Sequence, residues 1–145
     1  MFLQVLCISV LAFASQGTSS SQVPSALTPR QCQERLEGRW EAHLAARLSI
    51  IMEIEGNAIQ LFTIRDKQHS LAWKGKLAVS ETIPSDHLDW TDRVSAKGRL
   101  PDNQCLYRLV GDTLLLIGGG PDHRPERFLS GQGNEPKTIV FTRID

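Results

Sequence analysis

The densest group of side chains able to carry out chemistry lies between residues 86 and 92. Asp86, His87, Asp89 and Asp92 occupy this segment. A histidine among carboxylates can bind a metal ion or move a proton. No metal-binding spacing such as H-E-x-x-H or C-x-x-C occurs in the chain. We therefore predict a solvated loop that enters a strand, with Asp89 at a turn or paired internally, and no metal or other cofactor.

The glycine-rich segment nearer the C-terminus does not match a nucleotide-binding or nucleophile motif. Residues 118–120 are all glycine, but they run into Pro121 rather than into a helix, whose N-terminus would be needed to hold phosphate. No G-x-S-x-G, P-loop or dinucleotide fingerprint is present. Arg124 could bind an anion, but an internal carboxylate, Asp89 or Asp112, is the more common kind of partner for an arginine at a strand entry.

The N-terminal segment has the composition of a secretory signal. An apolar run opens the chain, and small residues from Ala12 to Gly17 follow it. The run is too short to span a bilayer. An apolar segment followed by small residues is typical of a signal peptide and its cleavage site. We predict a signal peptide over residues 1–17, cleaved after Ala14 or Gly17, a flexible lead-in over residues 18–27 and one domain over residues 28–145. Because Cys7 lies inside the run, no lipid anchor is predicted, and the mature protein is expected to be secreted or periplasmic.

The charges of the chain are balanced and dispersed. Lysine and arginine together number 16, and aspartate and glutamate also number 16, so the formal net charge is zero. No block of like charge occurs, and nothing in the sequence attracts nucleic acid or an anionic membrane surface. The predicted partners are instead a small apolar ligand or a protein of the cell envelope, bound by a monomer.

Two cysteines, Cys32 and Cys105, follow the predicted signal peptide. An isolated pair in an oxidising compartment is more often bridged than free. A bridge would close a long loop and stabilise the fold by roughly 4 kcal/mol in the chain-entropy model. The alternative is that both thiols are small buried hydrophobic groups. We predict the Cys32–Cys105 disulfide.

The elements that must position these residues begin with one short helix. Thr28 fits the N-cap, Pro29 the first helical position and Gln31 the partner in a capping box. Gly38 fits the glycine that commonly follows the last residue of a helix. The helix would present Cys32 and Leu36 to one side, because residues four apart share a face.

After Gly38 the hydrophobic period changes to two, which is typical of strands with one buried face. Phe62 and Ile64 are the likeliest inward residues of the second hairpin. Gly111 and Asp112 fit a two-residue type II′ turn. The other expected inward positions are Leu48, Ile50, Met52, Ile54, Leu71, Trp73, Gly75, Leu77, Val79, Leu88, Trp90, Tyr107, Leu109, Leu114, Leu116, Ile139 and Phe141. About eight short strands of this kind predict an all-β fold, an antiparallel β-barrel preceded by one helix, because closure removes exposed edges.

Several motifs occur in order and together resemble a bacterial family, the planctomycete-type lipocalin-like domain of unassigned function. Its members carry I-D-W, G-I-Y-x-L-x-G-D-T-L and R-P-x-x-F. The matching residues are Leu88-Asp89-Trp90, Cys105-Leu106-Tyr107 with Leu109, Gly111-Asp112-Thr113-Leu114, and Arg124-Pro125 with Phe128. The resemblance covers most of the chain after residue 37, and it implies a fold rather than a reaction.

Gly38-Arg39-Trp40 after the helix is similar to the G-x-W signature of lipocalins. In that superfamily the tryptophan packs across the closed end of the barrel, under an arginine from the last strand. Arg143 stands in the matching place, so the resemblance implies structural roles for Trp40 and Arg143. Stacking a guanidinium over an indole contributes about 0.5 to 2 kcal/mol.

Two classes of function remain open at the level of sequence. The first is a non-catalytic binding module that holds a small apolar ligand or docks an envelope protein. The second is an enzyme that acts from the barrel mouth, with Asp86, His87 and Asp89 as its acid–base residues. The absence of a paired nucleophile–base spacing favours binding, although a triad assembled in space leaves no such spacing.

Overall fold

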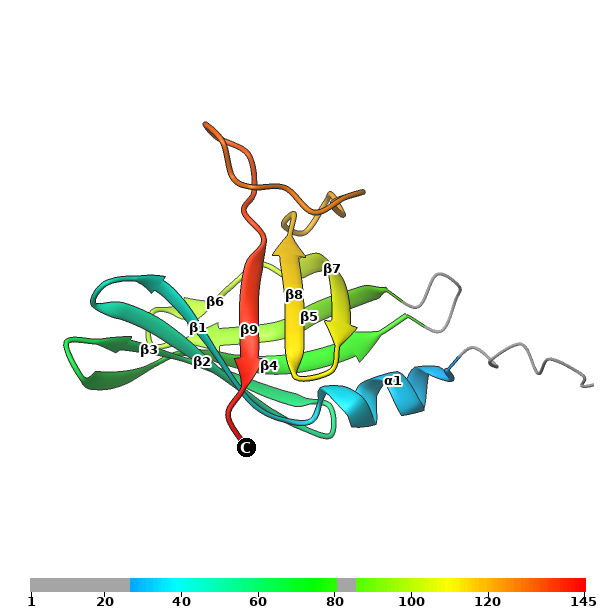
Figure 1. Cartoon of the computed structure of the whole chain (residues 1–145), viewed down its shortest axis with the longest axis horizontal. Helices are drawn as coiled ribbons and strands as arrows, with labels where there is room; N and C mark the ends of the chain where they lie inside the picture. The colour runs from blue at the N-terminus through cyan, green and yellow to red at the C-terminus, as the bar shows by residue number, and fades with distance from the viewer. Residues whose placement is uncertain (1–26, 81–85) are drawn as a thin grey trace, which may run out of the picture.

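The computed structural model describes residues 27–80 and 86–145. The predicted signal peptide and all of the predicted lead-in except Leu27 lie outside the described residues. The elements, drawn in Figure 1, are α1 (Pro29–Leu36), β1 (Gly38–Ala45), β2 (Leu48–Glu55), β3 (Ala58–Arg65), β4 (Gln68–Val79), β5 (His87–Ser95), β6 (Gly98–Arg99), β7 (Asn103–Val110), β8 (Thr113–Gly118) and β9 (Ile139–Arg143).

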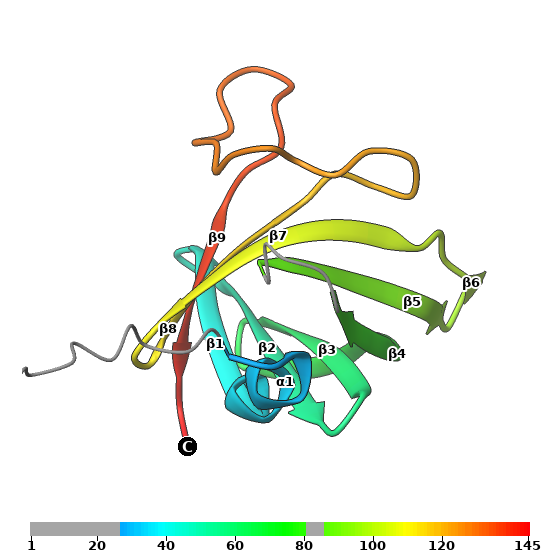
Figure 2. The same ribbon diagram turned by 90° about the vertical axis from the view of Figure 1, so that its right-hand side faces the viewer.

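The strands form one antiparallel sheet that closes into a barrel. Their order is β4-β3-β2-β1-β9-β8-β7-β5-β6, and a further pairing of β4 with β5 completes the ring. Eight strands make the wall, and the two-residue β6 is an extension of it. Figure 2 shows the ring of strands with α1, seen nearly end-on, in front of its lower part at one end of the barrel. The predicted fold class, an antiparallel barrel of about eight strands after one short helix, is confirmed.

Helix α1 forms where the capping signals predicted it. The Thr28 hydroxyl accepts a hydrogen bond from the Gln31 amide at 3.3 Å, and the Gln31 side chain accepts one from the Thr28 amide at 2.9 Å. The helix buries Cys32 and Leu36, as expected from their spacing. Among the described residues, no helix is long and apolar enough to cross a membrane.

Side chains fill the inside of the barrel. The buried core takes the predicted inward residues of β5, β7, β8 and β9, of which Leu109 and Ile139 are only partly buried, together with Trp40 and Ala42 from β1. From β2 it takes Ile50, Met52 and Ile54, whereas Leu48 is only partly buried and is not part of it. The hairpin turn before Thr113 has a positive φ at Gly111 but not at Asp112, which is the pattern of the predicted type II′ turn.

Two predictions about which side chains face inward are wrong. Strand β3 turns Ile59 and Leu61 inward instead of Phe62 and Ile64, because its register pairs Ile54 with Ile59 and Met52 with Leu61. Both faces of this strand carry apolar residues, so alternation alone did not fix its orientation. Leu71 is 46% exposed, because an irregularity next to Leu61 changes the phase of β4.

Candidate binding site at the open end of the barrel

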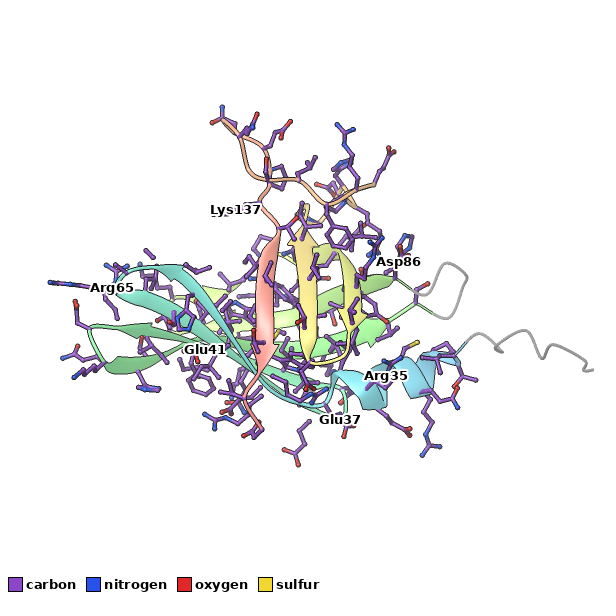
Figure 3. The ribbon with its side chains drawn as sticks, viewed as in Figure 1. Arg35, Glu37, Glu41, Arg65, Asp86 and Lys137 are labelled. Carbon is purple, nitrogen blue, oxygen red and sulfur yellow. The ribbon has the colours of Figure 1, made fainter. Side chains whose placement is uncertain are left out.

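The helix-covered end of the barrel is closed by Trp40 and Arg143. The Arg143 guanidinium stacks 4.2 Å from the centre of the Trp40 ring. It also donates hydrogen bonds to the backbone oxygens of Arg35 (2.7 Å) and Glu37 (2.6 Å), residues that Figure 3 labels at the end of α1. The Trp40 indole donates to the Leu36 oxygen at 2.8 Å. Three carbonyls at the C-terminus of the helix therefore accept hydrogen bonds from side chains. The helix-covered end of the barrel accordingly has a structural role.

Gly38 and Asp112 complete this closure. A Cβ at Gly38 would lie 2.7 Å from an Arg143 nitrogen, and the backbone φ of +118° also disfavours a side chain there. Asp112 lies 3.4 Å from the Arg143 Nε and joins the β7–β8 turn to the last strand. The contact between Trp40 and Arg143 that the resemblance implied is present.

Arg124 is held by internal partners rather than by an external anion. Its Nη2 lies 2.6 Å from the Asp89 carboxylate, and its Nη1 donates to the backbone oxygens of Cys105 and, at 3.3 Å, Leu88. The Arg124 side chain is only 20% exposed. Pro125, which follows, is buried. The expected pairing of Asp89 with Arg124 is thus present, and it fastens the segment after β8 to strands β5 and β7.

Two of the acid–base candidates, His87 and Asp89, lie on the outside of the wall near the helix-covered end, whereas the Oδ1 of Asp86 is buried without a hydrogen-bond partner among the described residues. His87 and Asp89 alternate with the inward-facing Leu88 and Trp90, so both face outward. Asp86 lies just before β5, at the opposite end of the barrel from Arg65 (Figure 3). The nearest oxygen of Asp86 is 3.8 Å from the His87 ring, beyond hydrogen-bonding distance. Within residues 27–80 and 86–145, no three His, Cys, Asp or Glu side chains group as metal ligands.

The predicted disulfide is not present. Cys32 on α1 and Cys105 on β7 are both buried free thiols. Burial, and after it the neighbouring Cys32, raises the pKa of Tyr107, whereas the Cys105 thiol donates to the Asn103 oxygen at 3.7 Å. The two sulfurs have different neighbours, and both behave as the small buried groups that the sequence left as the alternative. Burial raises the pKa of the Cys105 thiol to about 12.

A different set of residues faces inward, away from the helix-covered end of the barrel. The rings of Trp73 and Trp90 lie 5.0 Å apart, tilted by 53°. The Arg93 guanidinium packs on both rings, at 4.4 Å from the centre of Trp73 and 5.7 Å from that of Trp90. Leu61 and Leu100 are partly buried against the same core. This cluster combines apolar walls with one positive charge.

A β-bulge turns Arg93 inward. Lys76 pairs with Thr91 and Lys74 pairs with Val94, so Gly75 alone opposes the two residues Asp92 and Arg93. Asp92 adopts a φ of +49°, and its carboxylate is held by Lys76 at 3.0 Å and Arg99 at 3.3 Å. The hydrogen bond from Lys76 is the main reason why the pKa of Asp92 is lowered.

Gly75 makes room for the Arg93 backbone. A Cβ at Gly75 would lie 2.7 Å from the Thr91 oxygen and 3.2 Å from the Arg93 Cα. Gly75 thus lies at the register shift between β4 and β5, in the inner row that also holds Trp73 and Leu77. The close approach explains why glycine stands at this position in an otherwise apolar inner row.

Two N–H groups of this cluster are buried and have no partner in the described part of the chain. They are the Nε of Arg93 and the Nε1 of Trp90, which is itself only 8% exposed. The one hydrogen bond of Arg93 among the described residues runs from Nη1 to the Pro101 oxygen at 2.9 Å. No described carboxylate forms an ion pair with it, and burial lowers the pKa of the guanidinium. Buried donors and charges of this kind are costly unless something accepts from them.

Arg93 was missed at the level of sequence. Simple alternation from Leu88 and Trp90 places Asp92 inside and Arg93 outside. The available signals were weak: aspartate tolerates positive φ, and Gly75 interrupts the facing strand. Neither signal says which strand carries the extra residue.

Comparisons of the chain with protein-family models, with curated proteins and with solved structures found no match. The resemblance to the planctomycete-type lipocalin-like family therefore stays a prediction from the motifs. The function must be argued from the site itself.

Proposed function

We propose that this protein is a non-catalytic binding module that holds a small ligand with an apolar body at the open end of its barrel. The observation that carries the proposal is the opposite placement of two residue sets. The aromatic pair Trp73 and Trp90 faces inward, whereas the acid–base candidates His87 and Asp89 face outward near the helix-covered end. Aromatic walls with a few polar groups are typical of small-molecule sites.

The enzyme alternative has less support from the geometry. A general acid or base must reach the reacting atom and is usually desolvated to tune its pKa. The Asp89 carboxylate is occupied by Arg124 at 2.6 Å. The Oδ1 of Asp86 is buried without a partner among the described residues, but it lies 3.8 Å from the His87 ring, beyond hydrogen-bonding distance. These residues are better explained as parts of the wall and of the loop attachment.

The proposal includes the location of the protein and its oligomeric state. An apolar N-terminal run followed by small residues supports secretion or export to a periplasm. Closure of the sheet leaves little strand edge for pairing between chains, which supports a monomer. An envelope protein is the alternative partner within the same class of function.

The test is binding of a neutral apolar dye, N-phenyl-1-naphthylamine, by variants at the two sets of residues. His87→Ala should leave dye affinity and thermal stability nearly unchanged. Trp73→Leu should weaken dye binding about tenfold or more, because it removes a wall of the site. The measurement is dye fluorescence titrated with protein, with a thermal melt of each variant.

Trp40→Phe serves as the matched control, since it alters a buried tryptophan at the helix-covered end. This variant should be less stable than the parent protein. Its affinity for the dye, calculated from the concentration of folded protein, should be unchanged. Loss of binding in His87→Ala, with full binding in Trp73→Leu, would overturn the proposal and favour the enzyme alternative.

A further inference from the structure

The guanidinium of Arg93 has one occupied edge and one free edge. Nη1 donates to the Pro101 oxygen at 2.9 Å. The opposite edge carries Nε, which is buried and has no partner among the described residues. An arginine edge made of Nε–H and an Nη2–H fits the two oxygens of a carboxylate side by side.

Trp90 adds a third donor to the same cluster. Its indole ring lies 5.7 Å from the Arg93 Cζ, and its Nε1–H is buried without a partner. Trp90 is 92% buried, since its exposed fraction is 8%. An unpartnered buried N–H of this kind calls for an acceptor, because its desolvation is otherwise uncompensated.

We propose that Arg93 and Trp90 form the head-group site for an organic monocarboxylate whose apolar part lies against Trp73. This inference rests on the proposed binding function and names the ligand class of that site. The charge supports a monoanion, because one cation is available and the exposed Asp102 nearby adds negative charge. A phosphate dianion would need more positive charge than the described residues of this cluster supply.

A salt bridge to Asp102 is the internal alternative for the same edge. Asp102 acts on Arg93 only through space in the structure, without an ion pair. Replacing it separates the two explanations. If the edge is built for a ligand, Asp102→Asn should bind a carboxylate at least as tightly as the parent protein, because a competing negative charge is removed.

The experiment compares a dansylated undecanoic acid with its methyl ester, by fluorescence titration in a buffer without carboxylates. The parent protein should bind the acid about tenfold more tightly than the ester. Arg93→Gln should abolish this preference and leave ester binding within about twofold. Arg93→Lys keeps the positive charge but loses the two parallel N–H donors of the guanidinium. It should therefore retain only part of the preference for the acid.

Arg108→Gln is the matched control, because Arg108 also packs on an aromatic ring, that of Phe128 at 5.3 Å, but away from the cluster. It should keep the full preference for the acid. Thermal melts check that each variant is folded, and the acid–ester comparison on the parent protein stands even if Arg93→Gln does not fold.

The outcomes separate the two proposals. Equal affinity for acid and ester, or an acid preference that survives in Arg93→Gln, would overturn the carboxylate site and leave the proposed binding function in place. Binding of neither compound, with no binding of the neutral dye, would overturn both. Displacement of the acid by inorganic phosphate as readily as by octanoate would overturn the assignment to a carboxylate.

Discussion

Arginine side chains at three points of the barrel differ in what they contact. Arg143 covers an indole and donates to carbonyls at the end of α1, and Arg124 pairs with Asp89. Arg93 packs on two indoles but has a free edge. The same residue type is therefore structural where its donors are satisfied and is a candidate for recognition where they are not.

At the same scale, the thiol of Cys105 is expected to be unreactive. Its raised pKa of about 12 keeps it protonated at neutral pH, and only a thiolate reacts quickly with iodoacetamide. We predict that Cys105 is alkylated slowly in the native protein and rapidly in denaturant, as followed by mass spectrometry of its peptide. Rapid alkylation under native conditions, or recovery of a Cys32–Cys105 disulfide, would contradict this assignment.

The same shift predicts how stability depends on pH. The folded-state pKa is raised above its ordinary value of 9.0, so the contribution of the protonated thiol is fully present below pH 9. It is lost as pH rises toward 12, by about 1.4 kcal/mol for each pH unit. Cys105→Ala should make alkaline urea-unfolding curves less dependent on pH.

At the scale of elements, the turns differ in strain. The β3–β4 turn places Asp66 and Lys67 at φ of 49° and 70°, a pattern that type I′ turns normally give to Asn and Gly. A lysine in the left-handed region costs about 1 to 2 kcal/mol. The turn is held partly by an exposed contact of 3.7 Å between Arg47 and Asp66, which contributes little.

Lys67→Gly should therefore stabilise the protein by about 1 kcal/mol, measured by urea unfolding. Lys97→Gly is the matched control, because Lys97 lies in another exposed turn without a positive φ. It should give no gain or a small loss, since glycine increases the entropy of the unfolded chain. A stabilisation of equal size in both variants would show that backbone strain at Lys67 is not the cause.

The bulge at Asp92 shows how one element changes the chemistry of the interior. An unbroken alternation would turn Asp92 inward, whereas the extra residue opposite Gly75 brings in Arg93 instead. The sign of the charge inside the barrel therefore depends on a single irregularity in β5. Lys76 and Arg99 hold the displaced aspartate on the outside.

At the scale of the whole molecule, the two ends of the barrel are built differently. The helix-covered end is closed by stacking and satisfied carbonyls, and it joins α1 to the last strand. At the other end an arginine stacks on two indoles, and its Nε has no partner among the described residues. The first arrangement supplies stability, and the second is where we propose that a ligand binds.

Arg143→Ala should test the first of these roles. We expect a loss of about 2 to 4 kcal/mol in the free energy of unfolding, because the stacking and the hydrogen bonds to two carbonyls are removed together. Arg108→Ala removes a stack on the exposed side of the wall and should cost less than about 1 kcal/mol. Equal unfolding midpoints for the Arg143 variant and the parent would contradict the closure of this end.

The sequence by itself determined the features that depend on neighbours along the chain. The capping box at Thr28 and Gln31 and the turn at Gly111 depend on residues a few positions apart, so their signals are complete in the sequence. Strands with one apolar face required a sheet that closes on itself or packs on another layer, and closure was favoured because it removes exposed edges. The resemblance supplied the pairing of Trp40 with Arg143, which periodicity could not have found.

Only the tertiary structure decided the features that depend on register. Strand β3 is apolar on both faces, and its pairing with β2 chose Leu61 over Phe62. The bulge that brings Arg93 inward depends on the close fit of Gly75 against β5. Cys32 and Cys105 stay apart because each packs against different neighbours in the core. These contacts join residues far apart in the chain, and their energies become defined only when the barrel has closed.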